Sequence, residues 1–163
     1  MAKKSSKSKK ITLSVEKLVY ACAAVLGLVA LFLIFAPALN VSTSLTVSTY
    51  TGTQVVFGLE DYFAFSFMNL LTYLLLLGGI VLVVLKLVGL KSKLFDLLGA
   101  ALLIAAGVLF FITVGFTILT DGYASIVALA GATKSLAAGP IVAGILSLLS
   151  GAGVLCYALL GKK

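Results

Sequence analysis

The sequence predicts an all-α membrane protein, a four-transmembrane-helix bundle that carries a small extracellular β-hairpin. Three observations predict this fold class. The chain of 163 residues is 62% hydrophobic and only 10% charged, whereas soluble domains are usually about 45–50% apolar. Four apolar stretches are each long enough to cross a hydrocarbon core of about 30 Å. Between the first two lies a Ser/Thr-rich stretch, residues 39–62, that lipid would not accept.

The apolar stretches predict transmembrane helices at about residues 18–37, 63–85, 97–119 and 137–160, all within one domain of residues 18–163. Residues 1–17 are basic and polar, which is typical of a disordered tail. The longer loops are residues 38–62 and 120–136. One alternative stays open at the N-terminus, because a basic start, an apolar run and Ala36-Pro37-Ala38 also resemble a cleaved secretory signal.

The lysines predict the orientation of the bundle. Eleven of the twelve lysines lie in the N-terminal tail, in the short link of residues 86–96 or at the C-terminus, and only Lys134 lies in a longer loop. Basic residues concentrate on the cytoplasmic side of membrane proteins. We therefore expect a multi-pass protein of the plasma membrane with both termini in the cytoplasm and both longer loops outside.

The first outer loop has the alternating pattern of a half-buried strand from Leu39 to Tyr50. Thr51-Gly52 is expected to turn the chain, and residues 53–57 return as a second strand. Residues 58–61 then predict the start of the second helix, because Glu60 and Asp61 would favour its first turn. The side chains of this loop that are expected to face a partner are Val41, Leu45, Val47, Tyr50, Val55 and Phe57.

In the second outer loop, residues 123–136 fit either a short helix or a strand added to the hairpin. Small residues mark the last two predicted helices at Gly139, Ala143, Ser147, Gly151, Gly99 and Gly107. Small residues let helix backbones approach closely in a membrane, so we expect them to pack within this bundle, with contact between copies of the chain as the alternative. Cys22 and Cys156 are expected to be buried as small apolar side chains.

The four predicted spans hold no ionisable residue, which argues against a pump or an ion-coupled carrier. The chain has no His, its acidic residues are scattered, and Glu60 and Asp61 alone are too few ligands for a cation, so no metal or cofactor is predicted. No nucleophile with a neighbouring base is found, so the chain is not expected to be an enzyme. Nucleic acid is not expected as a partner, because the lysines are divided among apolar runs.

The layout of four spans, a β-rich first outer loop and a shorter second loop resembles the claudin and peripheral-myelin-protein-like tetraspan family. That family carries a Gly-Leu-Trp motif and a cysteine pair in its first loop. Here Gly58-Leu59 is followed by Glu60, the chain has no Trp, and neither cysteine lies in an outer loop. The resemblance therefore implies a similar arrangement of segments and transfers no functional residue.

Two functions fit these observations. The first is a non-catalytic structural or interaction protein that presents its outer loops to a membrane-protein partner or to a second copy of itself, with the lipid bilayer around its helices. The alternative is a small pore or permease subunit. Its path would be lined by weakly polar residues of the spans, namely Asn69, Thr72, Tyr73, Thr113, Thr117 and Ser147.

Overall fold

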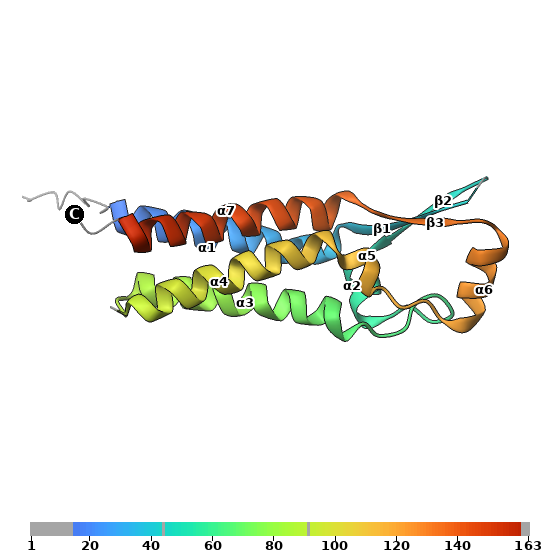
Figure 1. Cartoon of the computed structure of the whole chain (residues 1–163), viewed down its shortest axis with the longest axis horizontal. Helices are drawn as coiled ribbons and strands as arrows, with labels where there is room; N and C mark the ends of the chain where they lie inside the picture. Colours follow the sequence, from blue (N-terminus) through green and yellow to red (C-terminus); the bar gives the residue numbers. More distant parts are fainter. Residues whose placement is uncertain (1–14, 44, 91, 161–163) are drawn as a thin grey trace, which may run out of the picture.

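The computed structural model describes residues 15–43, 45–90 and 92–160 and contains four long helices and a three-stranded antiparallel sheet (Figure 1). The long helices are α1 (Val15–Phe32), which continues as the 3-10 turn η1 (Leu33–Phe35), α3 (Phe67–Val88), α4 (Lys93–Phe111) and α7 (Ala138–Leu160). Each is long and apolar enough to cross a membrane. The fold class predicted from the sequence is thus confirmed, and the chain is a multi-pass membrane protein.

The helices form an antiparallel bundle in which α1 and α4 each pack against both α3 and α7. The start of α1, the end of α7 and the α3–α4 link lie together at one end, here called the termini end (Figure 1). The sheet and the short helices extend lengthwise from the other end and form the lobe, residues 36–66 and 112–137.

Local chemistry explains where α3 begins and ends. The Ser66 hydroxyl accepts the Asn69 N–H as an N-cap, and Gly89 ends the helix with a left-handed backbone (φ 119°). The predicted start at Glu60 and Asp61 is wrong. The chain there is irregular, with a β-bridge between Leu59 and Phe63, so the capping serine and not the acidic pair sets the helix start.

Other helix limits also differ from the prediction. The first helical segment, α1 with η1, ends at Phe35 because Pro37 forces the preceding residue, Ala36, into an extended backbone (ψ 163°). At its other end, residues 15–17 belong to α1 and not to a disordered tail, whose first 14 residues lie outside the described part of the chain. The third long helix spans Lys93–Phe111 and is followed by the short helix α5 (Thr113–Phe116).

The predicted hairpin exists, but its turn lies elsewhere. Strands β1 (Pro37–Ser42) and β2 (Val47–Thr51) pair antiparallel, and the Thr43 N–H donates to the Thr46 carbonyl at 2.8 Å across the turn. The expected return strand is instead helix α2 (Gly52–Phe57), because Thr51 and Gln54 form a capping box. This local helix-start signal outweighs the strand preference of the β-branched residues at positions 53–56.

The second longer loop forms a short helix and then a strand, so both of the structures expected as alternatives occur in it. Helix α6 (Asp121–Leu129) is followed by strand β3 (Thr133–Leu136), which pairs antiparallel with β1 and completes a sheet of order β2-β1-β3. The central strand is therefore supported on both sides, and the two loops are joined into one unit. Its buried side chains form a core separate from that of the bundle.

Candidate functional site

The lobe has an aromatic core of its own. The Tyr50 ring meets Phe63 edge-on at 4.6 Å between centroids, and Tyr62 meets Tyr123 at 4.9 Å. The Tyr50 and Tyr123 hydroxyls share a hydrogen bond of 2.9 Å between β2 and α6. Burial, and then this bond, raise the pKa of Tyr123 above its usual value. The aromatic contacts fix α6 against the sheet, because edge-on aromatic pairs are favourable.

The residues predicted to face a partner divide into two groups. Leu45, Val47 and Phe57 are exposed by 91%, 64% and 60%, respectively. Val41, Tyr50 and Val55 are buried in the lobe core, so their assignment to a partner surface is wrong. Side chains alternate between the faces of a strand, and Tyr50 lies opposite the inward-facing Leu39 in the β1–β2 register.

The outer edge of β2 has open backbone groups. The closing pair Thr43 and Thr46 is hydrogen-bonded, and in an antiparallel ladder bonded and non-bonded pairs alternate. The register of β1 and β2 therefore directs the N–H and C=O groups of Ser48 and Tyr50 toward β1 and those of Val47 and Thr49 outward. No backbone hydrogen bond to Val47 or Thr49 occurs outside the sheet among the described residues.

The opposite edge of the sheet, at β3, differs in charge. It carries Lys134, whereas β2 has no charged residue. Lysine on an edge strand is a common device against unwanted strand pairing. The lobe thus has one edge with a charge and one uncharged edge, and the uncharged edge lies next to the exposed side chains of Leu45 and Val47.

A second polar site lies at the termini end. Lys86 Nζ of α3 and Asp96 Oδ2 of α4 are 2.8 Å apart, and their side chains are 12% and 5% exposed. The sequence placed both residues in the link between the predicted spans, whereas the structure includes Lys86 in α3 and Asp96 in α4. The ten-residue separation of these two residues around the Gly89 turn is the sequence signal that indicates the pair.

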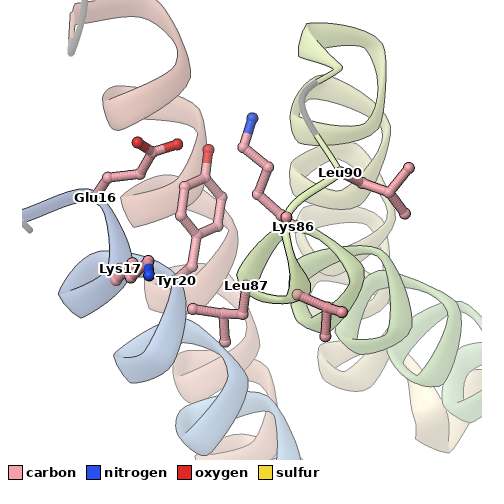
Figure 2. Close-up of a pocket in the computed structure, with 8 residues that line it drawn as sticks. Glu16, Lys17, Tyr20, Lys86, Leu87 and Leu90 are labelled. Carbon is pink, nitrogen blue, oxygen red and sulfur yellow. The ribbon is translucent and has the colours of Figure 1, made fainter.

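A pocket of about 260 Å³ opens beside this ion pair, between α1 and the end of α3. Figure 2 shows Glu16 and Tyr20 of α1 and Lys86 of α3 with their polar ends pointing the same way. Lys86 Nζ lies 5.7 Å from the centre of the Tyr20 ring, a favourable cation–π distance. Lys17 and residues 87–90 complete the wall.

The small residues of α7 and α4 lie at helix contacts. The Ser147 hydroxyl of α7 donates to the Leu103 carbonyl of α4 at 2.7 Å. A Cβ on Gly107 would come within 3.1 Å of the Gly144 carbonyl, and a Cβ on Gly151 within 3.0 Å of the Ala100 carbonyl.

The other three small residues also lie at contacts inside the protein. Ala143 is fully buried. Gly99 of α4 lies against Leu82 of α3, and Gly139 lies against the Pro37 carbonyl of β1.

The six residues proposed to line a pore are all buried, each at most 8% exposed. The hydroxyls of Thr72, Thr113 and Thr117 donate to carbonyls one turn earlier in the chain, and Asn69 donates to Thr117 at 3.4 Å. Tyr73 packs edge-on against Phe110. These side chains therefore lie in packed protein, and of their polar atoms Asn69 Oδ1 is buried without a hydrogen-bond partner among the described residues. The two cysteines, by contrast, are exposed on the bundle surface and not buried as expected.

No protein-family model matches this chain. No curated protein matches it either. The layout that resembles the claudin-like tetraspan proteins is thus a likeness in the arrangement of segments, and no family is identified.

Proposed function

We propose that the chain is a non-catalytic protein of the plasma membrane that displays the lobe outside the cell, where the open edge of β2 docks an extended segment of a partner protein. The single observation that carries this proposal is the uncharged outer edge of β2. An exposed strand edge can accept a further strand, whose main-chain hydrogen bonds provide affinity and whose side chains provide specificity.

The charge distribution supports the orientation. Eleven of the twelve lysines are found in the segments that adjoin the termini end, and the positive-inside rule assigns that end to the cytoplasm. The same distribution leaves the lobe with the single basic residue Lys134. A partner in the extracellular space or on a neighbouring membrane protein would therefore meet the lobe.

The architecture of the lobe supports docking at β2. The outward backbone groups of Val47 and Thr49 offer hydrogen bonds to one added strand. Leu45 and Val47 provide apolar surface next to them. The aromatic core beneath holds the strand in place through Tyr50, so the edge is rigid before a partner binds, which lowers the entropic cost of association.

Thr49 offers a matched pair of variants. Thr49→Pro removes an outward N–H without touching the β1 ladder, and proline is tolerated on edge strands. Thr49→Val keeps that N–H but loses the hydroxyl, which donates to Asn40 Oδ1 at 3.0 Å. A photo-crosslinker at Val47 in intact cells should give an adduct in the wild-type protein and in Thr49→Val, and should lose it in Thr49→Pro.

Two results would overturn the proposal. One is the absence of any adduct from Val47 although the protein reaches the cell surface, and the other is equal adduct formation in the proline variant. An adduct with a second copy of the chain would identify the partner strand as its own. A crosslinker at Lys134 on the β3 edge provides the control position and should give little product.

A further inference from the structure

The pocket at the termini end contains groups of both charges in a small space. Glu16, Lys17 and Lys86 lie in its wall with the Tyr20 hydroxyl, and Asp96 lies directly behind Lys86. Residues 87–90, at the C-terminal end of α3, complete the wall. The site therefore offers the Glu16 carboxylate and the Tyr20 hydroxyl as acceptors for a cationic group and the Lys86 ammonium for an anionic one.

Asp96 has acceptor capacity that the pocket's own residues do not use. Its Oδ2 binds Lys86, and Tyr20 interacts with the carboxylate, but Oδ1 is buried with no hydrogen-bond partner among the described residues. Buried polar atoms are nearly always hydrogen-bonded. Asp96 is not part of the pocket lining, so its carboxylate acts on a bound ligand only by holding Lys86 in place.

The position of the pocket restricts the ligand. Glu16 is in the first turn of α1 and Lys86 in the last turn of α3, and the 22 residues of α3 rise about 33 Å, close to the thickness of the hydrocarbon layer. The pocket thus lies at the level of the lipid headgroups. Its volume of about 260 Å³ is below the range of about 300–1,000 Å³ typical of sites for whole drug-sized ligands.

We propose that this pocket binds the headgroup of a phospholipid that carries a primary ammonium group. Glu16 and the Tyr20 hydroxyl oxygen accept hydrogen bonds from the ammonium, and Lys86 faces the phosphate. The Glu16 carboxylate beside the Lys86 ammonium matches a zwitterion better than an anionic headgroup. This inference concerns the other end of the molecule from the β2 edge, and it holds or fails independently of the lobe's proposed role.

The test uses the full-length protein in nanodiscs with equal amounts of phosphatidylethanolamine and phosphatidylcholine that have identical acyl chains. Native mass spectrometry counts the lipids retained after release. We expect retention to favour phosphatidylethanolamine about tenfold, because a trimethylammonium group cannot donate the charge-assisted hydrogen bond. Glu16→Gln should reduce that preference strongly, whereas the matched change Glu60→Gln, on an exposed carboxylate of the lobe, should leave it intact.

Equal retention of the two lipids would overturn the proposal, and so would an unchanged preference in Glu16→Gln. Preferential retention of phosphatidylglycerol would show a site for anionic phosphate alone and would also overturn it. A final arm adds soluble phosphoethanolamine, which has the same headgroup without acyl chains. Displacement of the lipid at equal concentration would assign the site to a soluble ligand, and lack of displacement supports the lipid. Circular dichroism of each variant confirms that the helices are retained.

Discussion

The two ends of the helix bundle bury polar groups in different ways. At the lobe end the polar side chains are neutral, and Thr72, Thr113 and Thr117 donate to carbonyls one turn earlier in the chain. At the termini end the polar groups are charged, and Lys86 and Asp96 depend on a partner in a different helix. The difference indicates that the lobe end tolerates the loss of any one polar group, whereas the termini end does not.

The energetic reason lies in what remains after one group is removed. A hydroxyl bonded to the nearby backbone leaves only a carbonyl that the helix already satisfies, and interhelical hydrogen bonds in membrane proteins contribute on average about 0.6 kcal/mol. Removal of one member of a buried ion pair leaves an uncompensated charge, which costs about 3–5 kcal/mol. The predictions below test this contrast.

The largest effect is expected for Lys86→Met. This change leaves the Asp96 carboxylate buried without its cation, so the free energy of unfolding should fall by about 3–5 kcal/mol. The double variant Lys86→Met with Asp96→Leu removes both charges and should regain most of that loss. Unfolding in mixed micelles with increasing denaturing detergent measures both. A loss below about 1 kcal/mol in the single variant would mean that the pair behaves as an exposed one.

A smaller effect is expected at the apolar contact between α4 and α7, which involves no charged group. Gly107→Ala would place a Cβ 2.7 Å from Leu148 Cγ and 3.1 Å from the Gly144 carbonyl, and such overpacking typically costs about 1–3 kcal/mol. The same change at Gly153 meets no atom within 4 Å and should stabilise α7 by about 0.5–1 kcal/mol. Equal effects at the two glycines in the same unfolding assay would contradict the close α4–α7 contact.

The smallest effect is expected at the lobe end, for Asn69→Leu. Asn69 makes one side-chain hydrogen bond, to Thr117 at 3.4 Å, and its Oδ1 has no partner among the described residues. A leucine of similar size removes both groups, so the free energy of unfolding should change by less than about 1 kcal/mol. A loss as large as that of Lys86→Met would show that the two ends do not differ in the way described here.

The sequence predicted the four long helices because each is marked by a long run of apolar residues. Many residues therefore carry the same signal. It did not predict the exact helix ends, which depend on single residues. Ser66 and Gly89 set the limits of α3, and Pro37 ends the first helical segment through its effect on Ala36. A charged residue near a boundary, such as Lys86, was assigned to a loop although its side chain is buried by a neighbouring helix.

The candidate sites, like the helix ends, could be predicted from the sequence only in part. The alternating pattern placed Val41, Leu45 and Val47 on one face of a single strand. The structure buries Val41 and exposes Leu45 and Val47, because the chain turns between Thr43 and Thr46. The capping box of Thr51 and Gln54 converted an expected strand into α2 and buried Val55. The pocket beside Lys86 joins residues about seventy positions apart on α1 and α3. No short-range pattern indicates such a pair, because it depends on which helices become neighbours.

The direct connections between sheet and helices have a mechanical consequence. β1 follows α1 through η1 alone, and β3 leads into α7 through Ala137, whereas α3 and α4 join the lobe through irregular segments and short helices (Figure 1). A pull on the sheet is therefore transmitted to α1 and α7 before it reaches α3 and α4. The bundle would then shear between the α1–α7 pair and the α3–α4 pair, and the pocket beside Lys86 lies on that division, between α1 and α3.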